Sequence, residues 1–375
     1  MFKNYLGMIM LSEDTRDMGS LTNCRPIAAI PIGARYRIID FILSNMVNGG
    51  IQNIGVFMQD NCRSLFDHLG TGKPWDLDRN TDGLFLFNFY ANDSREFDSR
   101  MIKNNMEYFY RSRQENVIIA SSYMICNIDF NEVINNHEKS GKDITIVYKK
   151  VKDGDENFLN CDVLNIDGEN RVLSVGKNLG AEKEVNISME ILLMKKKFLV
   201  DLIYEFIKRG NFCSLKNFIY KNIKDYSVNA YEFTGYLRCV NSVNQYYEAN
   251  MDLLDNKVIQ ELFFKNGNIY TKIKHEPPTR YLSLSKVSNS LIANGCLVEG
   301  TVENSIVARH VKIHKNAVVK NSIILQNCEI CEGAHLNYSI LDKNIKIFKE
   351  VFLRGVEHFP LVIRKNSTVD AFEEE

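Results

Sequence analysis

The sequence lacks several features that would place a chain of 375 residues in a special class. It has no apolar run long enough to span a membrane, so we do not expect an integral membrane protein. It has no excess of either charge: 46 basic and 47 acidic residues give a formal net charge of -1, which offers no overall attraction to nucleic acid or anionic lipid. Its 9 cysteines show no disulfide-framework spacing and its first residues show no signal-peptide pattern, which favours reduced thiols in a cytoplasmic protein.

Short apolar runs alternate with amphipathic stretches over roughly the first 250 residues, which is typical of βαβ units around a largely parallel sheet. Strands are predicted at residues 6–11, 54–58, 117–120, 144–148 and 187–194. Helical spacing of apolar residues predicts helices at residues 38–46, 199–207 and 243–254. This part of the chain is therefore expected to be an α/β domain.

A different pattern follows the paired prolines at positions 277 and 278, which interrupt regular structure. The triplet Asn-Ser-aliphatic begins at Asn289, Asn304 and Asn321, and aliphatic residues between the triplets recur every six positions. Six-residue periodicity, stacked into coils of roughly 18 residues, is typical of a parallel β-helix. The expected domains are an α/β domain at residues 1–276 and a β-helix domain at residues 277–375.

Four separated segments, together with the six-residue repeats, resemble the glucose-1-phosphate adenylyltransferases (ADP-glucose pyrophosphorylases) of bacterial glycogen synthesis. The segments are RYRIIDF at residues 35–41, LSNMVNGGI at 43–51, GKPWDLDR at 72–79 and YEANMDLL at 247–254. The resemblance covers essentially the whole chain. It implies a nucleotidyltransferase-like α/β domain with a doubly wound, mostly parallel sheet, followed by a left-handed parallel β-helix of hexapeptide repeats, in a tetramer.

The family holds the nucleotide triphosphate with a Gly-rich loop after the first strand, in which backbone amides and an Arg contact the phosphates. Counted back from Leu21 and Thr22, which match the end of that motif, the loop falls on residues 12–17. No glycine remains there, Asp17 stands at the position of the Arg, and Ile27 stands at the position of a downstream Lys. Because this segment is acidic, the resemblance implies that ATP phosphates are not bound in the familiar way.

The family also holds Mg²⁺ with two aspartates, and this chain has neither. Tyr123 stands at the first of these positions and Cys239 at the second. A phenol and a thiol are poor ligands for a hard cation that prefers carboxylate oxygen. Cys328 and Cys331 have the spacing of half a zinc site, but no second pair completes it, so we interpret them as packing residues of the repeat. No metal site is expected in this chain.

Two further correspondences concern anionic ligands. Lys177 and Ser188 match single positions of two family segments that bind the sugar phosphate, although the residues around them differ. Four arginines are candidates for an anionic effector site, because guanidinium groups suit phosphate or sulfate. Two of them align with a basic effector segment of the family and two lie near the C-terminus: Arg35, Arg37, Arg354 and Arg364.

In this family, retained fold motifs combined with replaced catalytic residues resemble the regulatory, GlgD-type subunit. The resemblance implies a non-catalytic or weakly catalytic chain that activates or tunes a GlgC-type catalytic subunit in a heterotetramer; homo-oligomers of the chain alone stay open. The complex would convert ATP and glucose 1-phosphate into ADP-glucose and pyrophosphate. No cofactor is expected on this chain, Mg²⁺ is expected only at the catalytic partner, and an anionic effector such as a phosphorylated sugar is compatible with the arginines.

Two alternatives stay open at the level of sequence. The chain is an active sugar-phosphate nucleotidyltransferase if it has rebuilt its phosphate loop, with Arg16 and Arg25 serving the phosphates. It is a stand-alone binding protein if it senses a sugar phosphate without a catalytic partner. Weak Mg²⁺-dependent turnover would favour the first alternative, and ligand binding with no effect on a partner would favour the second.

Overall fold

The computed structural model describes residues 4–59, 61–88, 97–209 and 213–370, and these residues form two compact units. The α/β unit comprises the described parts of residues 1–13, 39–239 and 261–270. The β-helix unit comprises the described parts of residues 14–38, 240–260 and 271–375. By packing, two segments from the first part of the chain therefore belong with the β-helix. The predicted domain boundary between residues 276 and 277 stays a prediction.

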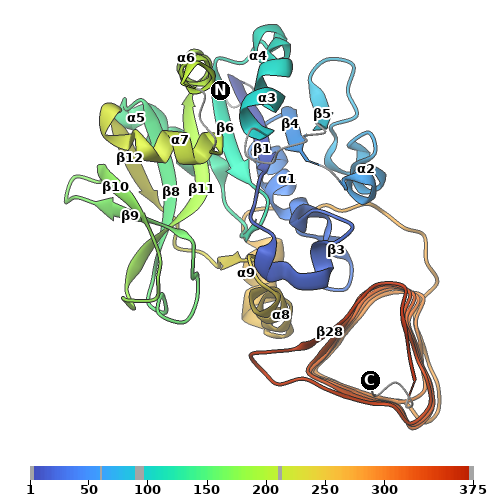
Figure 1. Ribbon diagram of the computed structural model, residues 1–375. Helices are drawn as coiled ribbons and strands as arrows, with labels where there is room; N and C mark the ends of the chain where they lie inside the picture. Colours follow the sequence, from blue (N-terminus) through green and yellow to red (C-terminus); the bar gives the residue numbers. More distant parts are fainter. Residues whose placement is uncertain (1–3, 60, 89–96, 210–212, 371–375) are drawn as a thin grey trace. The chain divides into compact units, whose positions relative to one another are not determined.

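A large mixed sheet is the centre of the α/β unit (Figure 1). Its strands are β1 (Tyr5–Leu11), β4 (Asn53–Met58), β5 (Gly83–Asn88), β6 (Asn116–Ser121), β8 (Ile144–Val151), β9 (Asp162–Ile166), β10 (Val172–Lys177), β11 (Val185–Lys195) and β12 (Val228–Glu232). Strands β6, β1, β4 and β5 lie side by side and run parallel. Strand β11 continues the sheet beyond β6 and runs antiparallel to β6, β8 and β9.

The five strands predicted from the sequence are confirmed as β1, β4, β6, β8 and β11. The sheet is parallel at its centre, as expected, whereas β11 introduces antiparallel pairing that the sequence did not reveal. The physical reason is that a continuous apolar run indicates a strand buried on both faces but carries no information about its direction.

Helices cover the sheet, and alternate residues of β1 contact different helices. The helices of the chain are α1 (Ile39–Asn48), α2 (Arg63–Leu69), α3 (Phe97–Asn104), α4 (Met106–Arg111), α5 (Phe130–Ser140), α6 (Lys196–Lys208), α7 (Leu215–Lys221), α8 (Val243–Met251) and α9 (Asn256–Phe264). Leu6, Met8 and Met10 pack into a core with apolar residues of α3, α4, α6 and α7. Gly7 faces α1 instead, and a Cβ there would lie 2.9 Å from the sulfur of Met46. None of the helices in the described ranges is long and apolar enough to cross a membrane.

Short elements complete both units. In the α/β unit they are β7 (Met124–Ile125), which pairs with β13 (Arg238–Cys239), and the 3-10 helices η4 (Lys73–Trp75) and η6 (Ile223–Asp225). In the β-helix unit they are β2 (Pro31–Ile32), which pairs with β3 (Tyr36–Arg37), and the 3-10 helices η2 (Arg16–Thr22), η3 (Ile27–Ala29) and η7 (Asp252–Leu254). Helix α8 contacts the segment of residues 14–38, since the Asn250 side chain accepts the backbone N–H of Gly33 at 3.0 Å.

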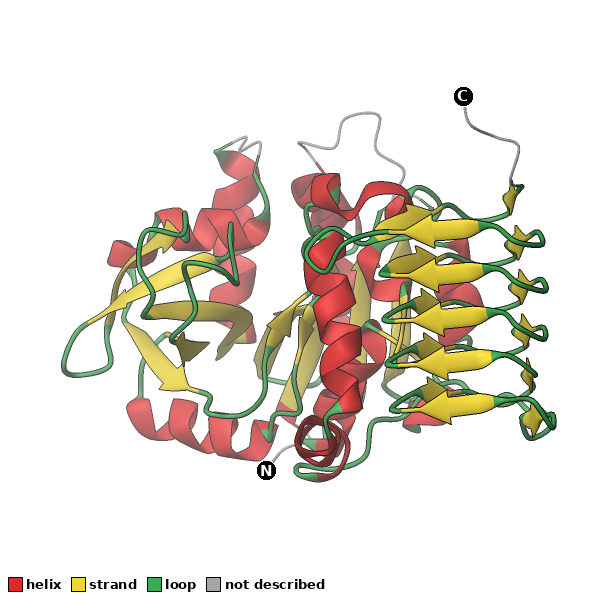
Figure 2. Cartoon of the chain, turned by 90° about the horizontal axis from the view of Figure 1, so that it is seen from below, coloured by secondary structure: helices red, strands yellow, loops and turns green. Residues whose placement is uncertain are grey.

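The C-terminal repeats form a left-handed parallel β-helix with a triangular cross-section (Figure 1), whose coils stack in Figure 2. One sheet contains β14 (Arg280–Tyr281), β17 (Leu297–Val298), β20 (Lys312–Ile313), β23 (Glu329–Ile330), β26 (Lys346–Ile347) and β29 (Thr368–Val369). A second contains β15 (Lys286–Ser288), β18 (Thr301–Glu303), β21 (Val318–Lys320), β24 (His335–Asn337) and β27 (Phe352–Arg354). The third contains β16 (Leu291–Ile292), β19 (Ile306–Val307), β22 (Ile323–Ile324), β25 (Ser339–Leu341) and β28 (Leu361–Ile363).

The Asn-Ser-aliphatic triplet forms the same corner in three successive coils, and the structure explains its composition. Its first residue has a positive φ, which Asn adopts more readily than most residues: 38° at Asn289, 47° at Asn304 and 46° at Asn321. The serines are stacked, because the Oγ of Ser305 accepts the backbone N–H of Ser322 at 3.1 Å and the Oγ of Ser322 accepts that of Ser339 at 3.1 Å. The predicted repeat is therefore confirmed as a corner that satisfies buried backbone groups from coil to coil.

Candidate functional site

Three residues that follow strands meet at the carboxyl edge of the sheet in the α/β unit. Strands β1 and β6 are parallel neighbours, so Glu13 after β1 lies beside Ser122 and Tyr123 after β6. In open α/β sheets this edge is the usual place for ligands. Tyr123, which the resemblance places at the first metal position of the family, is 9% exposed. The local structure therefore puts the replaced residues where the chemistry of such a fold is normally found.

The carboxylate of Glu13 is hydrogen-bonded to the segment that follows β6. Its Oε1 accepts the backbone N–H of Ser122 at 2.9 Å and the Ser122 hydroxyl at 2.7 Å. Burial, only partly offset by these hydrogen bonds, raises the pKa of Glu13 from 4.5 to about 7. Glu13 lies within the segment where the sequence comparison expected a phosphate-binding loop, so an acidic side chain occupies part of that region.

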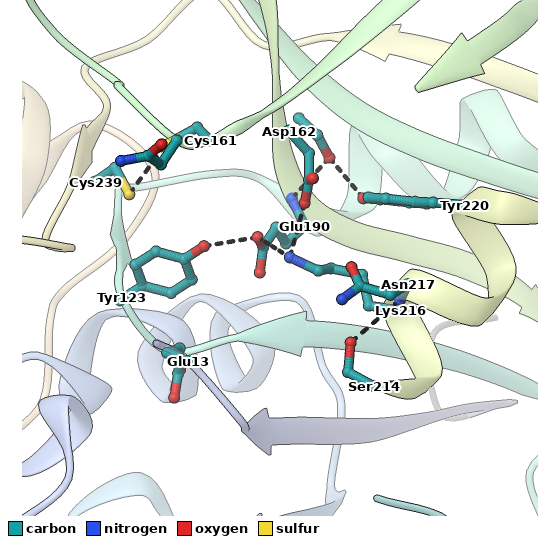
Figure 3. Close-up of polar contacts among 12 residues, drawn as sticks. Glu13, Tyr123, Cys161, Asp162, Glu190, Ser214, Lys216, Asn217, Tyr220 and Cys239 are labelled. Carbon is teal, nitrogen blue, oxygen red and sulfur yellow. Dashed lines mark hydrogen bonds and ion pairs between the residues drawn. The ribbon is translucent and has the colours of Figure 1, made fainter. Parts of the chain in front are cut away.

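Glu190 is the central residue of a buried polar group that also contains Tyr123, Asp162 and Lys216, which we call the Glu190 cluster (Figure 3). The Tyr123 hydroxyl donates to Glu190 Oε1 at 2.6 Å. Burial, followed by the negative charge of Glu190, raises the pKa of Tyr123 well above its usual range, so the phenol stays protonated and donates. Glu190 lies at an irregularity of β11, where the register shifts between Ser188 and Ile191.

The backbone of Glu190 is in a conformation that favours glycine. Its φ is +55°, and a non-glycine residue held there costs of order 1 to 3 kcal/mol. The bulge turns the side chain of Glu190 into the cluster, where 5% of it is exposed. A strained backbone at a buried, charged position is typical of functional sites.

Lys216 supplies the positive charge of the cluster. It lies in the first turn of α7, whose N-cap Ser214 accepts the backbone N–H of Asn217 at 3.2 Å. The Lys216 ammonium pairs with Glu190 Oε1 and with Asp162 Oδ2, the latter at 2.7 Å. Burial alone would lower the pKa of Lys216, but the carboxylates of Glu190 and Asp162 outweigh it and raise the pKa far above its usual value. The lysine is therefore fully charged and already has two counter-ions.

The two predicted sugar-phosphate residues lie beside this cluster. Lys177, at the end of β10, pairs with Asp162 Oδ1 at 2.8 Å and donates to the Asn160 carbonyl at 3.1 Å. Ser188, in β11, is buried and its Oγ lies 2.7 Å from the Tyr220 hydroxyl. The structure thus brings both residues close to Glu190 and Lys216. Their role in binding stays a prediction.

The two residues that the resemblance places at the metal-binding aspartate positions do not fit Mg²⁺. Cys239, in β13, is buried, and its Sγ lies 3.4 Å from the Sγ of Cys161. Burial raises the pKa of Cys239 well above its usual value, so the thiol stays protonated. The Tyr123 hydroxyl is directed at Glu190. A protonated phenol and thiol offer no oxygen anion to a hard cation. Within the described ranges, no group of three or more His, Cys, Asp or Glu side chains is arranged to hold a metal ion.

Residues 14–17 of the expected phosphate loop lie in the β-helix unit. Asp17 is exposed in η2, and Ile27 is buried in η3. Arg16 pairs with Asp14, and Arg25 forms a buried ion pair with Asp342 at 2.7 Å. The two arginines that an active enzyme would use for phosphates are therefore engaged with carboxylates of the chain itself.

A second charged site surrounds this buried ion pair. Burial, and then the positive charges of Arg37 and Arg25, lower the pKa of Lys343 from 10.5 to about 7. Lys343 follows Asp342 at a corner of the β-helix. We call Arg25, Arg37 and Lys343 the basic cluster. A lysine whose charged form is disfavoured by neighbouring arginines favours the binding of an anion, because an anion offsets that repulsion.

The other predicted effector arginines lie at different positions in the β-helix unit. Arg364 follows β28, where Leu341 pairs with Ile363, so it lies one coil beyond Asp342 at the same corner. Arg354 ends β27, seven residues before the start of β28 and at another corner. Arg35 stacks over the Tyr36 ring at 5.9 Å. The structure therefore groups Arg37 and the corner of Arg364 with Lys343, and it does not bring Arg354 to that corner.

Sequence reasoning missed Glu190, Lys216, Asp162 and Lys343. One signal was visible: Glu190 stands where the resembling family segment Ser-Met-Gly-Ile has glycine. An acidic residue at a glycine position indicates a special backbone conformation, as the positive φ shows. The partners of Glu190 come from β9 and α7, which are distant in sequence, so no local pattern revealed them.

Comparisons with known proteins agree with this architecture. Residues 15–173 match the family model of nucleotidyl transferases, and residues 277–357 match that of the GlmU-like C-terminal hexapeptide. The glycogen biosynthesis protein GlgD of Bacillus subtilis is 38% identical over 369 residues, 97% of each chain, and that of Geobacillus stearothermophilus is 38% identical over 366 residues, 96% of each chain. The glucose-1-phosphate adenylyltransferase of Mycoplasma mobile is 32% identical over 324 residues, 84% of each chain.

Proposed function

The chain belongs to the family that contains GlgD and the glucose-1-phosphate adenylyltransferases, and on this basis we propose that it is a regulatory subunit in glycogen biosynthesis. It is non-catalytic or weakly catalytic and tunes a GlgC-type catalytic subunit within a heterotetramer. The reaction of the complex joins ATP and glucose 1-phosphate to give ADP-glucose and pyrophosphate. Mg²⁺ acts at the catalytic partner, and this chain needs no cofactor of its own.

The observation that carries the proposal is the chemistry at the two lost aspartate positions. Tyr123 donates its hydroxyl to Glu190, and Cys239 lies against Cys161, so both positions are occupied by protonated, internally engaged groups. Nucleotidyl transfer needs a cation that neutralises charge as the α-phosphorus is attacked. A chain without ligands for that cation keeps the fold and the subunit surfaces but loses the means of turnover.

The test is pyrophosphate release from ATP, glucose 1-phosphate and Mg²⁺ by the chain alone, by a GlgC-type subunit alone, and by mixtures at several ratios. We expect no release above background from the chain alone, and a change in the rate or effector response of the partner that saturates at a fixed stoichiometry. Co-elution of the two chains in one complex should accompany the effect. A chain that turns over on its own, or that leaves the partner's rate and effector response unchanged, contradicts the proposal.

The alternative of an active enzyme with a rebuilt loop needs Arg16 and Arg25 at the phosphates. Arg25 is buried in its ion pair with Asp342, and Arg16 pairs with Asp14. Both pairs argue against this alternative, because each guanidinium already has a carboxylate partner.

The basic cluster favours a second activity, the binding of an anionic effector by this chain. Lys343, whose pKa is lowered to about 7 by burial and by Arg37 and Arg25, is only partly charged near neutral pH. An anion at this cluster raises that pKa, so binding takes up a proton. A stand-alone sensor would use the same site without a catalytic partner.

Calorimetric titration with inorganic sulfate, which does not titrate near neutral pH, tests this second activity at pH 7.5 in two buffers of different ionisation enthalpy. We expect proton uptake on binding by the natural chain and none by Lys343→Met. Lys315→Met, which changes an exposed lysine paired with Glu332, serves as the matched control and should bind as the natural chain does. Equal binding and equal proton uptake by all three proteins would rule out the basic cluster.

A further inference from the structure

The side chain of Glu190 occupies the centre of the Glu190 cluster although its backbone conformation disfavours any side chain. Its φ of +55° lies in the region where glycine is at ease. A glutamate is kept in such a conformation only where its side chain makes interactions that outweigh the backbone cost. The interactions of Glu190 therefore indicate what the residue does.

A single carboxylate oxygen of Glu190 contacts both donors, the Tyr123 hydroxyl and the Lys216 ammonium. Oε1 accepts the Tyr123 hydroxyl at 2.6 Å and also pairs with the Lys216 ammonium (Figure 3). A carboxylate oxygen held by one hydroxyl and one ammonium has the same surroundings as an oxygen of a bound phosphate ester. Ser188 Oγ, a predicted sugar-phosphate contact, accepts the backbone N–H of Glu190 at 3.2 Å.

Lys216 does not need Glu190 as a counter-ion. Asp162 already contacts the same ammonium at 2.7 Å, and Lys177 balances Asp162 from its other oxygen at 2.8 Å. Without Glu190, the cluster would hold two lysines and one carboxylate, together with the hydroxyl of Tyr123. Such a set carries a net positive charge and a free donor, which suits a phosphate monoester.

We propose that Glu190 is a built-in anion that occupies, within this chain, the place of the phosphate of a sugar phosphate, and so keeps the cluster closed to that ligand. The inference rests on the proposed function, because a subunit without turnover gains nothing from binding substrate that it cannot convert. Glu190 acts as a specificity-determining residue, because its carboxylate already binds the Tyr123 hydroxyl and the Lys216 ammonium that an external anion would need. Removal of the carboxylate opens the cluster to glucose 1-phosphate.

The test compares binding of glucose 1-phosphate, and of inorganic phosphate, by the full chain and its variants in calorimetric titrations without a partner. Glu190→Gly relieves the positive φ and removes the carboxylate, and we expect it to bind glucose 1-phosphate at least about tenfold more tightly than the natural chain. Glu190→Gln keeps the size but not the charge, and we expect an intermediate gain. Adding Lys216→Met to Glu190→Gly should return binding to the level of the natural chain.

Glu350→Gly is the matched control, since Glu350 also has a positive φ, 58°, but lies at an exposed corner of the β-helix. It should bind as the natural chain does, which separates relief of backbone strain from removal of the internal anion. Binding by Glu190→Gly that equals that of the natural chain, or that survives loss of Lys216, overturns the inference. If Glu190→Gly fails to fold, a folded Glu190→Gln with no gain in binding overturns it as well.

The two proposals fail separately. The binding test uses the isolated chain, whereas the proposed function is tested by the natural chain's effect on the rate of a catalytic partner. A partner effect without a binding gain in Glu190→Gly and Glu190→Gln removes only the inference about Glu190. A binding gain without any partner effect supports the internal anion and removes only the proposed regulatory role.

Discussion

The two units of the chain hold residues in the left-handed backbone region for different reasons. In the β-helix, such residues recur at the coil corners, and most are asparagines, as at Asn304, Asn321 and Asn344. In the α/β unit, Glu190 is a single, buried, charged residue with the same sign of φ. At the corners the conformation closes each turn of a repeat, whereas at Glu190 it delivers a carboxylate to Tyr123 and Lys216.

The comparison separates strain that belongs to an architecture from strain that belongs to a site. The corner asparagines are exposed or half-buried, and several donate to the equivalent residue of the next coil, as Asn327 does to Asn344 at 3.0 Å. The conformational cost of the positive φ is small at each corner, and the repeat of the sequence makes these corners predictable. Several residues of the α/β unit share the positive φ of Glu190, but Glu190 combines it with a buried charge. Its side chain is held by the Lys216 ammonium of α7 and the Tyr123 hydroxyl after β6, so its stability depends on charge.

The largest effect is expected from Lys216→Met. This change leaves the buried Glu190 without its ammonium, whereas Asp162 keeps Lys177, and an unpaired buried charge costs about 3 to 5 kcal/mol. Chemical denaturation should show that loss. Lys346→Met is the control in the β-helix: its exposed pair with Glu329, at 3.4 Å, should contribute less than about 1 kcal/mol. Similar losses in the two variants would remove the distinction between the units.

The next effect concerns the pH dependence of stability. The pKa of Glu13 is about 7 in the folded chain and about 4.5 when the residue is exposed by unfolding. Between these values the folded state binds more protons, so stability falls as pH rises from about 4.5 to 7, by roughly 3 kcal/mol. Glu13→Gln, whose amide oxygen still accepts from Ser122, should remove this contribution.

Urea denaturation at several pH values measures the contribution of Glu13 to stability, with the natural chain and Glu13→Gln compared at each pH. Asp167→Asn is a useful control, because hydrogen bonds from Arg171 lower the pKa of this half-buried aspartate, so Asp167 stays ionised between pH 4.5 and 7. Parallel pH profiles for the natural chain and Glu13→Gln would show that Glu13 is not the titrating group.

The sequence predicted the β-helix well because its architecture is local and repeated. The triplets at Asn289, Asn304 and Asn321 predicted coils, and the structure shows those residues at successive corners. The central strands were also predicted, since their apolar runs are continuous. Structure that depends on repeats or on short apolar runs can be predicted from the sequence alone.

The candidate site was predicted only as a set of losses. The replacements at Tyr123 and Cys239 were visible, but their present partners were not, because Glu190 and Cys161 come from other elements. The same holds for Lys343, whose lowered pKa depends on Arg25 and Arg37 from a segment some 300 residues away in sequence. Electrostatic environments are assembled by the tertiary fold, and a linear pattern carries no record of them.

The serine stack provides a smaller effect within the β-helix. Ser322→Ala removes the Oγ that accepts the buried backbone N–H of Ser339 at 3.1 Å, and an unsatisfied buried donor costs about 1 to 3 kcal/mol. Ser290→Ala, at the half-buried beginning of the stack, should cost less, because water can take the place of the lost Oγ as acceptor of the N–H of Ser305. The midpoints of thermal unfolding rank the two variants, and an equal cost at both positions would mean that the stack is not a buried network.

The smallest effect isolates the backbone conformation itself. Asn344 has a φ of +60° and an exposed side chain that donates to Asn366 at 2.8 Å. Asn344→Ala should destabilise the chain by about 1 to 2 kcal/mol, because alanine resists the left-handed region, whereas Asn344→Gly should recover most of that loss. The difference in unfolding free energy between the Gly and Ala variants measures the conformational cost without the side chain.

The same pair of substitutions at Glu190 completes the comparison. Both Glu190→Ala and Glu190→Gly lose the contacts with Tyr123 and Lys216, so the difference between them again reports only the backbone at φ +55°. Asn344 and Glu190 share one backbone conformation and differ in the contacts that stabilise it. The difference in unfolding free energy between the Gly and Ala variants should therefore be about 1 kcal/mol at both positions. A much larger difference at residue 190 would place the special feature of Glu190 in its backbone, and the carboxylate would then be a consequence of the bulge and not its reason.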